Sequence, residues 1–462
     1  MFKGKLYDFQ ELGAQKLKEN DWFLLADSMG LGKTVQAIHA VETLNLTKVL
    51  ILCPKVLCHQ WKNEIEKFTD STAVVIDGTK KKREELYNSN AKYFIVNYEK
   101  VLSDFSILSE TTWGVIIADE VQRIKNWKSK TSQLTKRIPA YRKWALTGTP
   151  IENTPDELYS IFSFLKPFFL GTWFDFEFRY IEKDLVVLPS GKTFWMTRNY
   201  KHLDDLKAKI RDKFLRRRKD EVAKDLPPVS EENIYCVLKP EQKRIYNDLK
   251  KKAIEAIQNQ ESHLGHLVLL RVTACNSYGI ALSTSPLAQG YNPIKGESGK
   301  MEELHNLLED IFKDESNNII IFTQWKKMQK IIKDSIKEPC SIICGGQTMN
   351  ERREEIQNFG KQNRILISTD AGAYGINLQQ ANYIIHFDHP WNPAKLSQRT
   401  ARAHRIGQKR PVTVFNLFTE GTIEERVIEV LNQKKEYFDA IIENKKEDTA
   451  LNRELLLKIL KS

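Results

Sequence analysis

Two arginines near the end of the chain, Arg402 and Arg405, stand three positions apart in a segment that has no acidic residue. The segment reads QRTARAHRIGQ at 398–408, and the small residues Ala401 and Ala403 flank the first arginine. Side chains three positions apart share one face of a helix, so we expect both guanidinium groups to point the same way. Two fixed cations need an anion, and a phosphate-binding loop far upstream can supply it.

That loop is the glycine-rich sequence GLGKT at 30–34. Its glycines let backbone N–H groups approach phosphate oxygens, Lys33 can neutralise the β- and γ-phosphates, and Thr34 can offer a hydroxyl to magnesium. The general pattern has glycine where Asp27 stands, and the alternative interpretation is a glycine turn that caps a helix. We predict that the following residues bind the nucleotide: Asp27, Ser28, Met29, Gly30, Leu31, Gly32, Lys33 and Thr34.

Two carboxylates, Asp119 and Glu120, end an apolar run at 114–118. In a parallel sheet such a strand places both carboxylates at the carboxyl edge, beside the phosphate loop. Asp119 can hold magnesium through its water shell, and Glu120 can orient and deprotonate an attacking water. An arginine delivered across a cleft stabilises charge on the transferring phosphoryl group. We therefore predict a catalytic set and a metal pair: Lys33, Asp119, Glu120, Arg402 and Arg405 for catalysis, and Thr34 with Asp119 for the metal.

Two further loops follow apolar runs and leave more than one interpretation open. The sequence TGTP at 147–150 is either a sensor of bound phosphate or an ordinary Gly-Pro turn. The small, glycine-rich sequence STDAGAYGINL at 368–378 can touch either a nucleotide or a nucleic-acid backbone. From this loop Gly375 joins the predicted nucleotide-binding residues, and so does Gln398 from the arginine segment.

Composition agrees with a polyanion-binding protein of the intracellular type. The 462 residues suffice for two or three domains, and 71 basic against 60 acidic residues give a net charge of +11. The N-terminal sequence MFKGKLYDFQ has no apolar core of a signal peptide, and polar residues and prolines interrupt the longest uncharged stretch, 272–294. The six cysteines form no CxxC pair, which favours reduced thiols over zinc. We expect a cytoplasmic protein of prokaryotic or viral source, or a nuclear one if the source is eukaryotic, and no membrane partner.

Short apolar runs occur in two separate sets, each followed by charged helical sequence, which predicts two α/β lobes with parallel sheets flanked by helices. The first set is 49–53, 93–96, 115–118 and 144–146, and the second is 319–322, 365–367, 383–387 and 412–418. The region between them is aromatic, then basic, and then carries the proline pair at 227 and 228, typical of a linker. We predict this division: a first lobe at 1–225 with a mostly helical insertion at about 156–213, a linker at 226–236, a second lobe at 237–430 with a helical insertion at about 240–296, and a helical tail at 431–462.

Motifs over nearly the whole chain resemble those of Swi/Snf-type ATPases, the motor family of chromatin remodellers and related DNA translocases in helicase superfamily two. The resemblance rests on their order and spacing. In chain order they are DSMGLGKT, CPKVLCHQWKNEIEKF, ADEVQRIKN, ALTGTPIEN, FLRRRKDEVAKDLPP, IIIFTQWKKM, STDAGAYGINL, WNPAKLSQRTARAHRIGQ and TEGTIEERV.

The resemblance implies two RecA-like lobes around ATP and Mg²⁺, with duplex DNA across both. Gln10 is similar to the family glutamine that reads adenine, and Arg402 and Arg405 are similar to its two arginine fingers. The segment with Lys55 and Trp61 is similar to one that packs behind and touches a DNA strand, although Trp61 reads better as core. The predicted DNA contacts are Lys55, Gln324, Ser368 and Thr369.

The chain departs from the family pattern at a few positions. Gln122 stands where the family has histidine, so it can still form hydrogen bonds and alter the coupling between ATP and DNA. Asp370 and Tyr374 replace basic and apolar residues, so that the carboxylate either sets charge near the ribose or repels one strand. Arg216, Arg217 and Arg218 match arginines that brace the lobes.

These features predict a monomeric DNA-stimulated ATPase that moves along duplex DNA and remodels protein–DNA complexes, with a protein partner supplying target choice. One alternative is an RNA-dependent or strand-separating helicase of the same superfamily. Another is an ATP-gated DNA clamp without turnover, which the departures at Gln122 and Asp370 favour.

Overall fold

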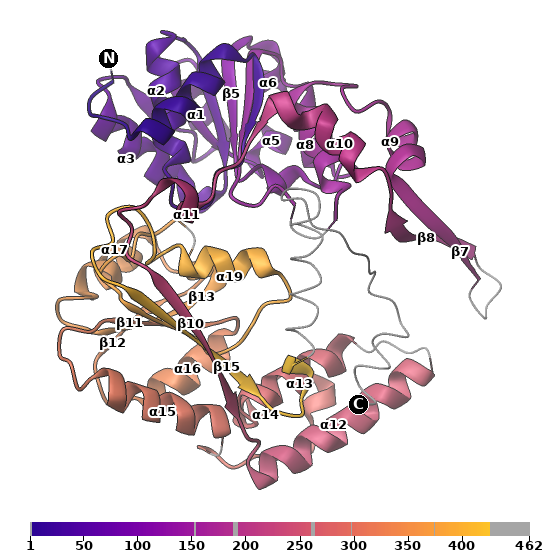
Figure 1. Ribbon diagram of the computed structural model, residues 1–462, viewed down its shortest axis with the longest axis vertical. Helices are drawn as coiled ribbons and strands as arrows, with labels where there is room; N and C mark the ends of the chain where they lie inside the picture. Colours follow the sequence, from indigo (N-terminus) through magenta and orange to yellow (C-terminus); the bar gives the residue numbers. More distant parts are fainter. Residues whose placement is uncertain are drawn as a thin grey trace. The chain divides into compact units, whose positions relative to one another are not determined.

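The computed structural model describes residues 2–151, 154–187, 193–259, 264–296, 298–373 and 375–425 of the chain. They form two compact units that divide between Asp225 and Leu226, and each unit is built around its own sheet (Figure 1). The predicted tail at 431–462 lies outside the described residues. In the described part, no helix is both long and apolar enough to cross a lipid bilayer.

The first unit contains a seven-stranded sheet whose neighbouring strands all run parallel. Central strands are buried on both faces, which explains the unbroken apolar runs that predicted four of them. In spatial order the strands are β3 (Ala73–Val75), β4 (Tyr93–Asn97), β2 (Val49–Cys53), β5 (Trp113–Asp119), β6 (Ala140–Leu146), β1 (Trp22–Leu25) and β9 (Phe214–Leu215).

Helices cover both faces of this sheet (Figure 1). Alternate residues of each strand point to opposite faces, so Ile51 and Ile117 join one apolar core while Leu50 and Ile116 join the other. The first core is closed by α1 (Asp8–Glu19), α2 (Lys33–Thr43) and α3 (Cys58–Phe68), and the second by α5 (Lys100–Ser103), α6 (Phe105–Glu110) and α8 (Glu157–Leu165). The remaining elements before the insertion are η1 (Lys55–Leu57), α4 (Lys80–Tyr87), η2 (Val121–Ile124) and α7 (Lys130–Arg137).

The segment at about 156–213, expected to be a mostly helical insertion, also contains strands. It begins with α8 and continues with α9 (Trp173–Tyr180), the antiparallel pair β7 (Ile181–Val187) and β8 (Thr193–Tyr200), α10 (Leu203–Ile210) and η3 (Arg211–Lys213), while α11 (Lys219–Val222) follows β9 outside it. Figure 1 shows this pair extending away from the body of the first unit. Its strands are rich in β-branched and aromatic residues and flank the turn-forming sequence PSG at 189–191, a hairpin signal that the sequence analysis overlooked.

The second unit contains a six-stranded, all-parallel sheet. Its spatial order is β10 (Val229–Cys236), β15 (Val412–Thr419), β14 (Tyr383–His386), β11 (Ile319–Thr323), β13 (Ile365–Thr369) and β12 (Cys340–Ile343). The predicted linker at 226–236 is largely occupied by β10, which pairs with β15 over its full length. Prolines before a strand favour extended backbone, so the pair at 227 and 228 leads into a strand here.

The helices of the second unit also lie on both faces of its sheet, and two of them form a separate core. On one face are α15 (Gly299–Ile311) and α16 (Lys326–Ser335), and on the other is α17 (Met349–Asn358). The additional core packs α12 (Pro240–Gln258) against α13 (Leu264–Cys275), two helices in the segment 240–296. The short elements are α14 (Tyr278–Ala281), η4 (Pro286–Ala288), α18 (Asp370–Ala373) and α19 (Pro393–Thr400). Both units are therefore α/β lobes with parallel sheets, which confirms the predicted fold class.

A buried ion pair holds the start of α15 against the end of the described chain. Lys300 is fully buried, and its Nζ lies 2.7 Å from Oε2 and 2.8 Å from Oε1 of Glu424. The same ammonium donates to the carbonyl of Phe387 at 2.8 Å, and Glu424 accepts the backbone N–H of Thr419. These partners compensate both charges for their loss of water.

We expect Glu424→Gln to destabilise the second unit by about 3–5 kcal/mol, because it leaves a buried ammonium without its counter-charge. Guanidinium denaturation followed by circular dichroism measures the effect. The exposed pair of Lys313 and Asp310 provides the control, since Lys313→Ala should change stability by less than about 1 kcal/mol. Equal losses for the two variants would contradict the structural role of the buried pair.

Candidate nucleotide site

The predicted catalytic groups of the first unit meet at the carboxyl edge of its sheet. The phosphate loop follows β1, Thr147 follows β6, Asp119 ends β5 and Lys55 follows β2. These four strands are consecutive neighbours in the sheet and parallel, so their carboxyl ends lie side by side. Ligands of open parallel sheets bind at this edge.

The phosphate loop has the backbone that anion binding requires. Gly30 and Gly32 adopt φ of 86° and 76°, and α2 begins directly afterwards at Lys33, so the unpaired N–H groups of its first turn follow the loop. Gln10 donates from Nε2 to the carbonyl of Leu31 at 3.1 Å and is buried. A Cβ at position 32 would lie 2.5 Å from that nitrogen, so glycine is needed for this approach. Gln10, predicted to read adenine, therefore lies against the phosphate loop.

Lys33 points back into the loop and is surrounded by carboxylates. Its Nζ donates to the carbonyl of Asp27 at 2.6 Å and lies 3.4 Å from that of Ser28. Burial lowers the pKa of Lys33, and the carboxylates of Glu120, Asp27 and Asp119 oppose that shift in this order. The ammonium is thus close enough to interact with both acids at the end of β5. This is the juxtaposition that the sequence predicted.

The carboxylate of Asp27 is engaged within the protein. It accepts hydrogen bonds from Nε of Arg217 at 2.9 Å and from Nη2 at 2.5 Å, and a further one from Gln36 at 3.2 Å. Asp27 is fully buried, so a contact with a nucleotide would come from its backbone. The neighbouring Arg216 donates to the carbonyls of Ala26 and Gly148, each at 3.2 Å. The predicted bracing arginines therefore brace the phosphate loop itself.

Asp119 is held by groups from three elements. Its Oδ2 accepts the indole N–H of Trp61 on α3 at 2.8 Å, and its Oδ1 accepts the N–H of Glu120 at 2.9 Å. Tyr98, which follows β4, donates its hydroxyl to the backbone carbonyl of Asp119 at 2.9 Å. Burial, with the charge of Glu120 in addition, raises the pKa of Asp119 to about 7, while the Trp61 hydrogen bond and Lys33 oppose this. The carboxylate is oriented but poorly solvated.

A chain of hydrogen bonds leads from Glu120 to the loop after β6. Gln122 donates from Nε2 to Oε2 of Glu120 at 2.7 Å, and its Oε1 accepts the hydroxyl of Thr147 at 2.8 Å. Thr147 in turn accepts the N–H of Thr149 at 2.9 Å. Glu120 adopts a left-handed backbone with φ of 48°, which is uncommon for a residue other than glycine and is found at functional sites. The TGTP loop is therefore physically connected to the predicted general base.

The phosphate loop also touches the TGTP loop directly. A Cβ at Gly148 would lie 2.3 Å from the side chain of Met29, so only glycine permits this packing. The bonds from Arg216 to Ala26 and Gly148 tie the same two loops together. A change at the phosphate loop can thus reach the TGTP loop by two routes.

The arginine segment of the second unit differs from its predicted form. The helix α19 ends at Thr400, so Arg402 and Arg405 lie in consecutive turns and the expectation of a shared helix face is wrong. The physical reason is a set of tertiary bonds: Nε2 of Gln408 donates to the carbonyls of Gln379, Ala381 and Ala403, which curls the chain back on itself. Arg405 donates to Oδ1 of Asn377, and the carbonyl of Arg402 accepts the N–H of Leu378. Both arginines are therefore attached to the glycine-rich loop at 368–378.

Asp370 has a structural partner that neither sequence-based interpretation included. It accepts from Nε of Arg399 at 2.6 Å, and Lys395 lies 3.9 Å away. Arg399 is 2% exposed and also donates to the carbonyl of Asp388 at 2.7 Å. The acidic residue thus neutralises a buried arginine on α19. Tyr374 lies outside the described residues, while Gly375 follows in a left-handed turn with φ of 73° and Gln398 is buried in α19.

The predicted DNA contacts differ in accessibility. Lys55 is exposed at the start of η1. Gln324 points inward, with Nε2 donating to the carbonyl of His389 at 2.8 Å and to Asp388 at 3.1 Å. Ser368 is fully buried and bonds the carbonyl of Thr369, which is itself 3% exposed. Of the four side chains, the geometry supports nucleic-acid contact for Lys55 alone.

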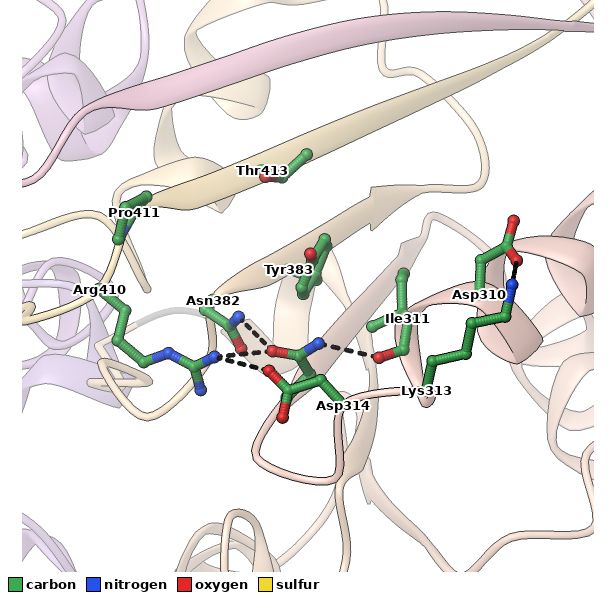
Figure 2. A pocket seen from close by; sticks show the side chains of 10 residues that line it. Asp310, Ile311, Lys313, Asp314, Asn382, Tyr383, Arg410, Pro411 and Thr413 are labelled. Atoms are coloured by element: carbon green, nitrogen blue, oxygen red, sulfur yellow. Dashed lines mark hydrogen bonds and ion pairs between the residues drawn. The ribbon is translucent and has the colours of Figure 1, made fainter.

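Figure 2 shows a cavity of about 460 Å³ in the second unit, which none of the predicted site residues lines. It opens at the amino edge of the sheet, where Tyr383 begins β14 and Thr413 is the second residue of β15. Arg410 reaches across it to Oδ1 of Asn317 at 2.7 Å and lies 3.8 Å from Asp314. Its polar groups pair with one another, so the cavity is not the nucleotide site.

Sequence reasoning missed Trp61 and Gln36 as supports of the site, and it assigned Arg217 to bracing of the lobes rather than to the carboxylate of Asp27. Trp61 was assigned to the core, where it does lie, with 1% of its surface exposed. Its role as a hydrogen-bond donor could have been predicted, because the N–H of a buried tryptophan needs an acceptor. All six cysteines are unpaired thiols, as predicted, and four of them are buried.

The residues present fit a magnesium ion. No cluster of three or more His, Cys, Asp or Glu side chains in the described ranges could enclose a metal by itself. Mg²⁺ in nucleotide sites is instead held by one or two protein oxygens together with phosphate oxygens and water. Thr34 in the first turn of α2 and the oriented carboxylate of Asp119 are such ligands.

A phosphate loop and an Asp-Glu pair on one α/β lobe and an arginine segment on the other are the motifs of a helicase-type ATPase. The SNF2-related domain matches residues 15–280, and the helicase conserved C-terminal domain matches residues 299–407. The chain belongs to the SNF2-related family. It carries an SNF2-related domain followed by a helicase conserved C-terminal domain.

Relatives in bacteria and animals have similar sequences over nearly all of the chain. A Bacillus subtilis protein described as a putative ATP-dependent helicase/translocase YwqA is 32% identical over 98% of this chain and 50% of its own length. The human SWI/SNF-related matrix-associated actin-dependent regulator of chromatin subfamily A member 1 is 32% identical over 92% of this chain and 42% of its own length. The chain thus spans about half the length of these relatives. The solved Sulfolobus solfataricus SWI2/SNF2 ATPase core in complex with dsDNA is 31% identical, covers 96% of this chain and 93% of its own, and has a TM-score of 0.46.

The raised pKa of Asp119 predicts a stability penalty. Between pH 3.8 and about 7 the folded protein keeps a proton that the unfolded chain releases, so stability falls as the pH rises through this window. Asp119→Asn removes the titrating charge but can accept only one of the two N–H bonds, so we expect its effect on the apparent Tm to be more favourable at pH 8 than at pH 5, by about 3–6 °C, without nucleotide or magnesium. Calorimetry measures both values.

Asp104→Asn is the matched control. Asp104 is buried like Asp119, but Arg83 lies 2.6 Å away and helps to lower the pKa of Asp104, so this variant should lower the Tm at pH 8. An effect of Asp119→Asn on the Tm that is no more favourable at pH 8 than at pH 5 would contradict the penalty.

Proposed function

We propose that the protein is a double-stranded DNA translocase that couples ATP hydrolysis to movement along DNA and remodels protein–DNA complexes. The observation that carries the proposal is the placement of Lys33 among Asp119 and Glu120 at one sheet edge, with a hydrogen-bonded path from Glu120 to a second loop. The family of the chain and the helicase and translocase names of its relatives support it.

The side chains divide the work of phosphoryl transfer. Lys33 and the first-turn N–H groups of α2 bind the β- and γ-phosphates, and Gln10 lies where a base can bind beside the loop. Glu120 orients the attacking water and accepts its proton, while Gln122 fixes the position of the Glu120 carboxylate. Magnesium, when bound at Thr34 and Asp119, neutralises charge on the phosphates. Arg402 and Arg405 supply the positive charge that the transferring phosphoryl group needs.

Duplex DNA is the proposed track. The net charge of +11 suits a polyanion, and exposed Lys55 lies at the same sheet edge as the catalytic groups. We infer movement on intact duplex because relatives are named for translocation and chromatin regulation as well as for helicase activity. A protein partner supplies target choice in this proposal.

The purified chain should hydrolyse ATP at least about tenfold faster with duplex DNA than without nucleic acid. Lys33→Ala and Arg402→Ala should each lower kcat by about 10³-fold or more, because they remove charge from the phosphoryl group, and should leave salt-dependent DNA binding largely intact. Phosphate release and fluorescence anisotropy measure the two properties.

The nucleic acid used as activator distinguishes the alternatives. Stronger activation by RNA or single strands would indicate an unwinding helicase, and nucleotide-dependent DNA binding without phosphate release would indicate a clamp. Lys81→Ala on the exposed face of α4 is the control for general loss of positive charge.

Gln122 is expected to couple the Glu120 carboxylate to the TGTP loop. Gln122→Ala removes both hydrogen bonds, and we expect a fall in DNA-stimulated kcat of about 10- to 100-fold, with the KM for ATP changed by less than about threefold. Thr147→Val, which loses the far bond alone, should reduce DNA stimulation more than the basal rate. Equal loss of basal and stimulated rates in both variants would mean that the path positions the base without linking it to DNA.

A further inference from the structure

Trp61 makes a hydrogen bond whose partner sets it apart from comparable tryptophans of the first unit. Its indole N–H donates to a carboxylate oxygen of Asp119 at 2.8 Å, and its ring is 1% exposed. Trp113 and Trp144 are equally buried, but they donate to the backbone carbonyls of Leu108 and Asn20 at 3.0 and 3.1 Å. A buried tryptophan needs an acceptor, and a backbone carbonyl would suffice for that need.

The bond to Asp119 restricts how the carboxylate can turn. The N–H of Glu120 occupies Oδ1 and the indole occupies Oδ2, so the carboxylate plane is fixed from two sides. Each carboxylate oxygen accepts more than one hydrogen bond, which leaves lone pairs for the water shell of a metal ion. A hydrogen bond to a charged group is about twice as strong as a neutral one, and more so where water is excluded.

Trp61 also connects this carboxylate to the segment at 54–57, in which Lys55 is exposed while Pro54 and Leu57 are buried. The 3₁₀ turn η1, which begins with Lys55, runs directly into α3, and Trp61 lies in the first turn of that helix. The N–H of Leu57 bonds the carbonyl of Pro54, so the turn is stiff. The backbone from Lys55 to Trp61 is therefore continuously hydrogen-bonded, and a displacement of the turn would move the indole.

We propose that Trp61 is a positioning residue that orients Asp119 for magnesium–nucleotide and transmits contact at the segment 54–57 to that carboxylate. This inference rests on the proposed function for its second half, because the contact is with duplex DNA. Its first half concerns only the binding of metal and nucleotide. Trp61 itself touches neither substrate nor metal and acts through Asp119.

The test compares W61F, which keeps an aromatic ring but loses the N–H, with W113F and W144F as matched losses of a buried indole hydrogen bond. W61H restores a donor, since histidine Nε2 and tryptophan Nε1 both lie two bonds beyond Cγ. The first measurement is the affinity for a fluorescent ATP analogue as Mg²⁺ is titrated, without hydrolysis. The second is the ratio of ATPase rates with and without duplex DNA.

We expect W61F to require about tenfold more Mg²⁺ for half-maximal nucleotide binding and to lose most of its DNA stimulation. W61H should recover to within about threefold of the wild type, and both control variants should stay within about twofold. Thermal unfolding should show similar losses of Tm for W61F, W113F and W144F. If W61F requires no more Mg²⁺ than W113F, the positioning role is overturned.

The wild-type protein provides a measurement that does not depend on how the variants fold. The indole N–H resonance of Trp61, assigned by its disappearance in W61H, should shift on adding magnesium–nucleotide and again on adding duplex DNA. An indole signal that responds to neither addition would overturn the inference. Absence of DNA stimulation in the wild type would count against the proposed function instead, while the magnesium titration would still decide the first half.

Discussion

The first unit buries one ammonium and several carboxylates at one edge of its sheet, and these charges do not neutralise one another completely. Lys33 sits among Asp27, Asp119 and Glu120, and its pKa is lowered by burial in spite of them. Asp27 shares its charge with Arg217, which donates two hydrogen bonds to its carboxylate. The remaining two acids are left for chemistry, and the raised pKa of Asp119 shows that the fold bears a cost for this.

Neutral donors maintain this arrangement. The indole of Trp61, the hydroxyl of Tyr98 and the amide of Gln122 each hold an atom of the acidic pair without adding charge. Orientation by neutral groups preserves the field that a phosphate would meet, which is the requirement for electrostatic preorganisation. The second unit follows another rule, because there Arg399 is held by Asp370 and Asp388 in a fully charged network. That network fixes the base of the arginine segment.

The sequence pattern predicted the elements that depend only on residues close together in the chain, namely the buried strands and the phosphate loop. Strands buried on both faces, such as β2 and β11, read as unbroken apolar runs, and the phosphate loop was recognisable from its glycines and Lys33. Short strands such as β9, and the polar edge strand β10, carry no such run and were missed. The turn at Arg402, the partner of Asp370 and the acceptor of Trp61 depend on residues far away along the chain. No spacing rule could supply those contacts.

The edge strand β10 has a consequence for association of the protein with itself. In the described part of the second unit it is one of the two edge strands, and residues 229–233 along it are exposed, among them Glu231 and Glu232. Unpaired peptide groups on such an edge can recruit another strand and start aggregation. Two adjacent carboxylates repel a second copy of the same edge and also repel nucleic-acid phosphates. The border of the sheet is thereby protected against both self-association and adhesion to a polyanion.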